Sequence, residues 1–122
     1  MWKWAGAYII MVWAFAAVLF VDARAQEPRL RFTHLSGEQG LSNTTIEAIC
    51  QDSRGFMWIG TRDGLNRYDG HTIVVFRSDP GDSGTLSDSY IRCIYEDRKH
   101  ALWAGTVNGL NLYDPAHGRF TR

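Results

Sequence analysis

Several features that define whole classes of protein are scarce or absent in this sequence. Two cysteines in 122 residues are too few for a cysteine-rich zinc site. The formal net charge is zero and no basic patch stands out, so nucleic acid is not an expected partner. There is no G-x-S-x-G motif, no glycine-rich loop between a strand and a helix, and no kinase or cyclase signature. We therefore expect no catalytic residue and no cofactor site in this chain.

Metal-ligand patterns are missing as well. The acidic loop from Asp79 to Gly84 lacks the spaced ligands and closing glutamate of an EF-hand, and we interpret it as a connecting turn. The histidines stand singly in expected turns or at strand ends: His34, His71, His100 and His117. The sequence thus predicts no metal site.

The long apolar run is confined to the N-terminus. An apolar stretch from Trp4 to Val21 precedes Ala23-Arg24-Ala25, a small-x-small site that suits signal peptidase. We predict a cleaved secretory signal, a hydrophobic helix within residues 1–25. The alternative is a retained membrane anchor, because 18 apolar residues reach the lower limit for a membrane span. Both interpretations place the remaining chain outside the cytoplasm.

Cys50 and Cys93 would then enter a compartment in which disulfides persist. They fall on the same expected strand of two successive repeats, two residues apart in register. A bridge between neighbouring strands and a pair of buried free thiols both remain open. The second is favoured because free cysteine behaves as a small hydrophobic residue.

What the sequence has in abundance is repetition. The stretch from Asp52 to Asp69, DSRGFMWIGTRDGLNRYD, returns 45 positions later as DRKHALWAGTVNGLNLYD from Asp97 to Asp114. Aligned without a gap, residues 41–69 and 86–114 agree at 13 of 29 positions. A period in the mid-forties is typical of propellers and solenoids.

Each repeat contains four short strand signals separated by turn residues. The expected strands cover residues 46–51, 56–60, 65–68 and 72–77 in the first copy, and 91–96, 101–105, 110–113 and 119–122 in the second. Asp63-Gly64 and Asn108-Gly109 favour tight hairpin turns. The first strand of each copy is apolar on both faces, which predicts burial between layers. Four antiparallel strands in about 44 residues form one propeller blade, so we predict an all-β fold of two blades.

The repeated residues have structural roles in such a blade. Trp58 and Trp103 are expected to bury their rings between blades. Gly60 and Gly105 are expected to let backbones approach closely. Packing residues recur in every blade, whereas a catalytic residue is needed only once.

The two copies resemble a known family. LSNTTIEAICQDSRGFMWIGTRDGLNRYDG and LSDSYIRCIYEDRKHALWAGTVNGLNLYDP are similar to the two-component regulator propeller repeat, with L-S, I-x-x-I-x-x-D and W-x-G-T-x-x-G-L-N-x-Y-D. His100 departs from the pattern at a turn position that is usually glycine, and Ala104 stands where the first copy has Ile59. The resemblance implies the periplasmic sensor of a large bacterial membrane protein, whose output is a histidine kinase, a hybrid regulator or a diguanylate cyclase. It also implies an oligosaccharide or another small ligand.

Two blades cannot close a ring, so we expect an N-terminal fragment whose partners are further blades of the parent chain. The expected organisation is a signal peptide over residues 1–25, an arm with an edge strand from Leu30 to Leu35 within 26–40, a first blade over 41–85 and a second, truncated blade over 86–122. Membrane contact is expected only through the signal segment or a further C-terminal helix. Made alone, residues 26–122 are expected to be loosely folded or prone to aggregation through unpaired edges.

Ligand contacts are expected from loops at one end of the blades. The loop before the first strand and the turn between the second and third strands share that end, and their residues differ between the copies. Such divergence is typical both of a ligand surface and of unconstrained loops. The predicted ligand-binding residues are Asn43, Arg62, Asp63, Asp88 and Asn108, with Thr44 and Val107 beside them.

The sequence therefore favours a binding module: the ligand-sensing propeller portion of a two-component-type signalling protein. The first alternative is a fragment of a secreted propeller enzyme that resembles a lyase or a glycosidase, whose acids and bases come from loops of several blades. The second is a secreted binding scaffold that completes its ring by self-association.

Overall fold

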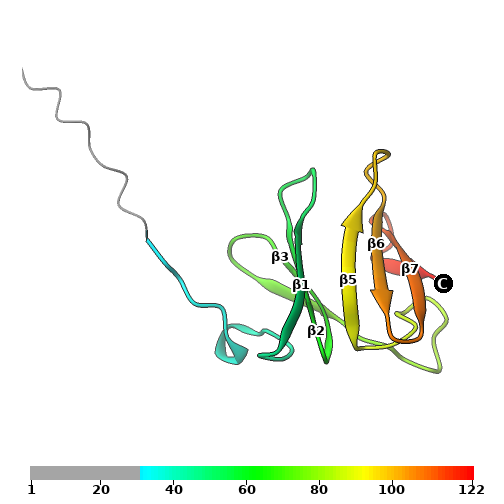
Figure 1. Ribbon diagram of the computed structural model, residues 1–122, viewed down its shortest axis with the longest axis horizontal. Helices are drawn as coiled ribbons and strands as arrows, with labels where there is room; N and C mark the ends of the chain where they lie inside the picture. Colours follow the sequence, from blue (N-terminus) through cyan, green and yellow to red (C-terminus); the bar gives the residue numbers. More distant parts are fainter. Residues whose placement is uncertain (1–30) are drawn as a thin grey trace, which may run out of the picture. The chain divides into compact units, whose positions relative to one another are not determined.

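The computed structural model describes residues 31–122, so the predicted signal peptide lies outside the described residues. Eight strands in this range form two four-stranded antiparallel meanders (Figure 1). Within the same range, no helix combines the length and the apolar character needed to cross a membrane. The first sheet contains β1 (Ile46–Gln51), β2 (Met57–Thr61), β3 (Gly64–Tyr68) and β4 (Ile73–Phe76), and the second contains β5 (Ile91–Glu96), β6 (Leu102–Thr106), β7 (Gly109–Asp114) and β8 (Arg119–Thr121). These bounds confirm the all-β prediction, and each of the eight strands expected within the two repeats is present to within one residue at each end.

The turn between β2 and β3 lies one position earlier than the Asp-Gly pair suggests. Thr61 pairs with Gly64, so Arg62 and Asp63 are the two central residues of the turn. Gly64 follows at φ 139°, where a Cβ would also lie 2.9 Å from the carbonyl oxygen of Phe76. The second sheet repeats the arrangement, with Thr106 paired to Gly109. Glycine is thus required at the end of the turn rather than inside it.

The segment before the first sheet differs from expectation. Residues 31–36 form no strand, so the edge strand predicted over 30–35 is wrong for the described residues. A strand needs a hydrogen-bonded neighbour, and none of the described strands pairs with this segment. Ser36 instead caps a 3₁₀ turn, η1 (Gly37–Gln39), which Gly40 ends at φ 97°.

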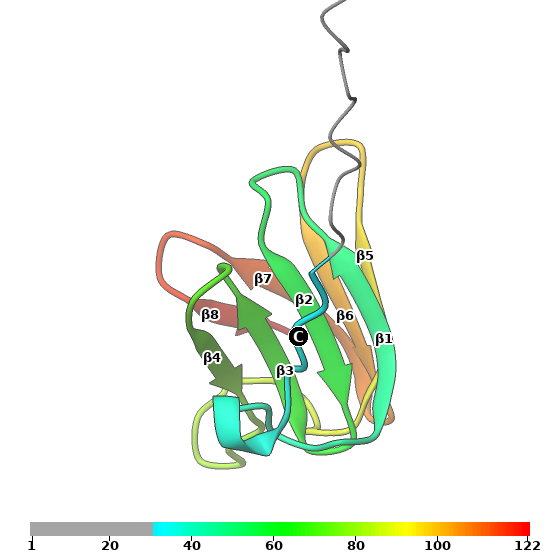
Figure 2. The same cartoon turned by 90° about the vertical axis from the view of Figure 1, so that its left-hand side faces the viewer.

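The two sheets pack face to face, with β1 and β5 side by side (Figures 1 and 2). Trp58 is fully buried between them, and its ring centroid lies 4.9 Å from that of Tyr113. Gly60 makes this approach possible, because a Cβ there would lie 2.6 Å from Cγ2 of Ile91. The core also contains the following buried side chains: Leu65, Leu86, Leu102, Ala104 and Phe120. The predicted roles of Trp58 and Gly60 are therefore confirmed.

Equivalent positions of the two sheets are not equally buried. Leu65 is completely buried, whereas Leu110, at the same place in the repeat, is 57% exposed. The prediction that the first strand of each repeat is buried on both faces is wrong for this structure, since Ile49 in β1 is 58% exposed and Tyr95 in β5 is 62% exposed. The reason is that each sheet has only one neighbouring sheet within residues 31–122, which leaves one face of each uncovered. Trp103 is only half-buried for the same reason.

Candidate functional site

In each repeat an aspartate after the first strand holds the turn that follows; it is buried in the first sheet, as Asp52, and partly buried in the second, as Asp97. Asp52 accepts backbone N–H groups from Arg54 at 3.0 Å and Phe56 at 2.9 Å through Oδ1, and the Trp58 indole N–H at 2.9 Å through Oδ2. Asp97 repeats all three bonds in the second sheet, with Trp103 as its indole partner at 3.1 Å. The indole bond, followed by a backbone bond from Ala101, lowers the pKa of Asp97. These aspartates close the turn and orient the tryptophan, which explains their repetition without ligand chemistry.

A second polar network closes the opposite end of each sheet. The Asn66 side chain donates to the Ile59 carbonyl at 3.0 Å and to Ser42 Oγ at 2.8 Å, while its oxygen accepts the Ser42 N–H at 2.9 Å. Thr61 joins the network through a 2.8 Å bond with Ser42 Oγ. The second sheet reproduces it with Ser87, Thr106 and Asn111. The L-S, T and N positions of the repeat are therefore structural, and the positions that differ between the copies lie in the loops around them.

The five predicted ligand residues lie in the loops at this end of the sheets, the lower end in Figure 2. The structure brings two of them together, since Asn108 donates its amide to Asp88 Oδ2 at 2.7 Å. Asp88 Oδ1 also accepts the Tyr90 N–H at 2.7 Å. In the first sheet Asn43 accepts the Thr45 N–H in the same way but has no side-chain bond to Asp63. Asn43 and Asp63 are thus not joined as Asp88 and Asn108 are.

Asp63 and Arg62 point to different partners from their shared turn. Asp63 Oδ2 accepts Arg77 Nη2 at 3.1 Å, a pair in which both side chains are half exposed. Arg62 Nε donates to Glu47 Oε1 at 2.8 Å. The Arg62 guanidinium and then the Tyr90 hydroxyl, which donates to the same oxygen at 3.0 Å, hold the pKa of Glu47 below its ordinary value. Arg62 therefore belongs to a contact that crosses from one sheet to the other.

Three residues of this contact escape prediction from the sequence: Glu47, Tyr90 and Arg92. The guanidinium carbons of Arg62 and Arg92 lie 5.5 Å and 5.3 Å from the centroid of the Tyr90 ring. A signal for two of them was present in the sequence, because Glu47 and Arg92 occupy the same position of successive repeats and carry opposite charges. Tyr90 stands where the first copy has Thr45, and no pattern distinguishes it.

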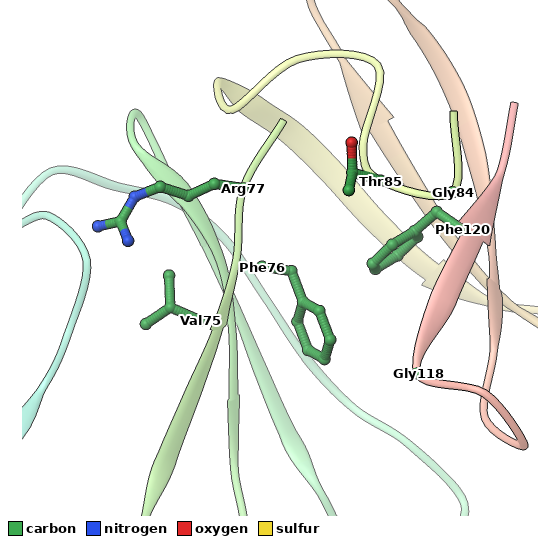
Figure 3. A pocket seen from close by; sticks show the side chains of 7 residues that line it. All are labelled: Val75, Phe76, Arg77, Gly84, Thr85, Gly118 and Phe120. Carbon is green, nitrogen blue, oxygen red and sulfur yellow. The ribbon is translucent and has the colours of Figure 1, made fainter. Parts of the chain in front are cut away.

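A separate hollow of about 200 Å³ lies between β4 and β8 (Figure 3). The rings of Phe76 and Phe120, with centroids 5.4 Å apart, form its apolar side. None of the five predicted ligand residues borders it; its lining is Val75, Phe76, Arg77, Gly84, Thr85, Gly118 and Phe120.

Among residues 31–122, the cysteines form no disulfide and the acidic side chains form no metal site. Cys50 and Cys93 are both free, so no disulfide joins them, and Cys93 is exposed rather than buried. Its strand face is one that no other sheet covers within the described residues. Across residues 31–122, no group of three or more His, Cys, Asp or Glu side chains is arranged to hold a metal ion.

The repeats match a family that is described as two component regulator propeller, over residues 40–63 and 85–108. A curated relative, Histidine kinase P4 of Formosa agariphila, is 42% identical over 82 residues. That alignment covers 67% of this chain and 6% of the relative, so the chain spans a small part of the relative's length.

Two solved structures from B. thetaiotaomicron are similar in fold and sequence, and both are described as extracellular domains of hybrid two component systems. BT3049 has a TM-score of 0.65 and 30% identity, over 73% of this chain and 13% of that one. BT4673 has a TM-score of 0.56 and 34% identity, over 64% of this chain and 11% of that one. With matching repeats in both sheets, the chain belongs to the two-component regulator propeller repeat family.

Proposed function

We propose that the chain is the extracytoplasmic, ligand-sensing portion of a bacterial two-component-type signalling protein of the membrane. The observation that carries this proposal is the pair of family repeats in a fold similar to the extracellular domains of hybrid two component systems. The similarity to a histidine kinase supports the same role. In this proposal the chain binds a signal and performs no catalysis, and its output lies elsewhere in the parent protein.

One face of the second sheet is not covered by another sheet within residues 31–122. This supports the proposal that a further blade of the parent chain packs against it. Leu110 and Trp103 stand on the second sheet where Leu65 and Trp58 stand on the first, and only the first pair is fully buried. A third blade packed there would bury Leu110 as the second sheet buries Leu65. Apolar area of this kind contributes roughly 25 cal/mol per Å² when it is removed from water.

The ligand is proposed to be an oligosaccharide or another small molecule held at the loop end by the five residues named above. Hydrogen bonds fix several of these side chains on tight turns and strand ends, as a preformed site requires. The proposed extracytoplasmic location depends on the predicted signal peptide over residues 1–25. If the signal is cleaved as predicted, the mature protein begins at Gln26, which N-terminal sequencing of the exported protein tests.

The function is tested by titrating the full-length protein with a panel of oligosaccharides and following heat of binding and thermal unfolding. The expected result is a saturable stabilisation by one class of ligand, with the ligand recovered unchanged. A panel that neither binds nor shifts the unfolding temperature would contradict the proposal. Recovery of cleaved sugar would instead establish the enzyme alternative.

A further inference from the structure

The inner strands β1 and β5 each contain a bulge at the same repeat position. Ile46 pairs with Thr61 and Ala48 with Gly60, which leaves Glu47 as the extra residue of β1. Ile91 pairs with Thr106 and Cys93 with Gly105, which leaves Arg92 as the extra residue of β5. A bulge re-aims its side chain away from the regular ladder and is enriched next to binding sites.

The two bulged residues meet around one aromatic ring. The guanidinium groups of Arg62 and Arg92 both lie over Tyr90, within 5.5 Å of its centroid. Glu47 fixes the arrangement by accepting both Arg62 Nε and the Tyr90 hydroxyl. The four side chains therefore carry two positive charges and one negative charge on a scaffold of two strands and a tight turn.

The guanidinium donors in this cluster are mostly unoccupied. Among residues 31–122, Arg62 donates a hydrogen bond only through Nε, to Glu47, and Arg92 donates none. A planar guanidinium presents its N–H groups in a fork that matches a carboxylate or a sulfate. The ring that a neutral sugar would stack on is already covered by these two cations.

We propose that Arg62 and Arg92, aligned by Tyr90 and Glu47, bind the carboxylate or sulfate group of an acidic oligosaccharide. This inference rests on the proposed ligand-sensing function and specifies its ligand class. Glu47 acts as a positioning residue, since it holds Arg62 and Tyr90 and repels anions itself. The selectivity for acidic over neutral sugars comes from the second arginine, which leaves the cluster one charge positive.

The test is calorimetric titration of the full-length protein with oligosaccharides in matched forms. The panel contains uronic acid oligosaccharides, their methyl esters, sulfated oligosaccharides and inorganic sulfate. We expect an acidic oligosaccharide to bind and its neutral counterpart to bind at least tenfold more weakly. Arg62→Gln and Arg92→Gln should each weaken acidic binding roughly ten- to hundredfold, the value of a hydrogen bond to a charged group. The uronate and sulfate arms identify which anion is recognised, and the free sulfate arm shows whether the sugar is needed.

The matched control is Arg98→Gln, which removes the same charge from an exposed turn residue at the opposite end of the sheets. It should leave acidic binding within twofold, and all three variants should keep the parent's unfolding temperature. Equal binding of acidic and methylated forms, or unchanged binding in both cluster variants, would overturn the anion site while leaving ligand sensing intact. A panel without any binding would overturn both proposals.

Discussion

Trp58 and Asp52 are joined by a buried hydrogen bond of 2.9 Å from the indole nitrogen to Oδ2. Asp52 precedes Trp58 by six residues, so the carboxylate and the indole lie on opposite sides of the β1–β2 turn. The Trp58 ring belongs to the core between the sheets. Asp97 and Trp103 share the spacing and the bond, but their tryptophan is only half-buried. The same aspartate–tryptophan hydrogen bond therefore occurs once with a fully buried indole and once with a half-buried indole. Its contribution to the free energy of unfolding can be measured in both environments.

Asp52→Ala should lower the free energy of unfolding by about 3 kcal/mol, because it leaves the indole and two backbone N–H groups without their acceptor. Asp97→Ala should cost clearly less, since water can reach Trp103. Urea denaturation of the full chain, followed by tryptophan fluorescence, measures both. An equal loss of unfolding free energy in the two variants would show that burial of the indole does not determine how much this hydrogen bond stabilises the fold.

The turn residue His100 offers a stabilising substitution. It has φ 61°, and it is the one non-glycine residue with positive φ between residues 31 and 122, whereas Gly55 fills the equivalent turn at φ 91°. His100→Gly should raise the free energy of unfolding by about 0.5–1 kcal/mol, after the entropy of glycine in the unfolded chain is included. The contact of His100 with Glu96, at 3.6 Å, contributes little in return, because the His100 side chain is 71% exposed.

The reciprocal change serves as the control for that prediction. A Cβ on Gly55 would meet no atom within 4 Å, so Gly55→Ala tests backbone conformation without a clash. It should cost about 1 kcal/mol. If thermal unfolding shows His100→Gly to be destabilising, the left-handed turn does not carry the expected strain.

Close packing between the sheets predicts a difference between two equivalent glycines. Gly60→Ala places a Cβ against the branched Cβ and Cγ2 of Ile91 and should cost about 1–3 kcal/mol. Gly105→Ala meets Cys93 Sγ, the end of an exposed side chain that can rotate, and should cost less. Combining Gly60→Ala with Ile91→Ala should cost less than the sum of the single changes in a double-mutant cycle. Strict additivity would rule out a direct clash.

Leu65 and Leu110 test the proposal of a further blade. Leu65→Ala should cost about 2–5 kcal/mol in any chain that contains both sheets, because the side chain is completely buried. Leu110→Ala should change stability by less than about 0.5 kcal/mol in residues 1–122 alone. In the full-length parent, a cost close to that of Leu65→Ala is expected. A negligible effect there would mean that no blade covers this face.

Acid should weaken the fold through its turn carboxylates. Asp69 accepts the Thr72 N–H at 2.7 Å and the His71 N–H at 2.8 Å, and these bonds lower its pKa from 3.8 to about 2. Since the unfolded chain binds the proton more readily, this contribution is complete above pH 3.8 and is lost as the pH falls to about 2. The pKa values of Asp82, Asp97 and Asp114 are lowered too, so they act in the same direction.

Asp69→Asn should therefore lower stability at neutral pH and flatten its decline in acid. Thermal unfolding across this pH range measures both effects, with Asp63→Asn, in the exposed turn at the other end of β3, as the control. Parallel curves for the parent and Asp69→Asn would show that Asp69 does not titrate differently on folding.

The strands could be predicted because their signals are local. Short apolar segments, turn dipeptides and the 45-residue echo place each of the eight repeat strands to within one residue at each end. The strand predicted over residues 30–35 failed because strand formation depends on a partner, which local alternation does not supply. The indole bond of Asp52 was missed for a different reason: the turn alone explains an aspartate there. The six-residue spacing to tryptophan, present in both copies, was the signal that could have revealed it.

The candidate site was only partly predictable. Arg62 could be predicted as a site residue because it lies in a turn and because the second repeat has a different residue, Val107, at the same position. Its contacts with Glu47 and Tyr90 could not be predicted, because they join different sheets and depend on two bulges that nothing in the sequence of β1 and β5 marks.

The serine, threonine and asparagine network of each sheet is closed within its own repeat. Within the part of the chain that the structure describes, the side chains of Ser42, Thr61 and Asn66 bond only to one another and to the backbone of their own repeat, and Ser87, Thr106 and Asn111 do the same. A genetic duplication or loss of 45 codons, in frame with the repeat, would therefore add or remove a whole network and orphan no buried polar group. Propellers built from this unit can change their number of blades during evolution by single recombination events, and each new blade is free to diverge at its bulge and turn.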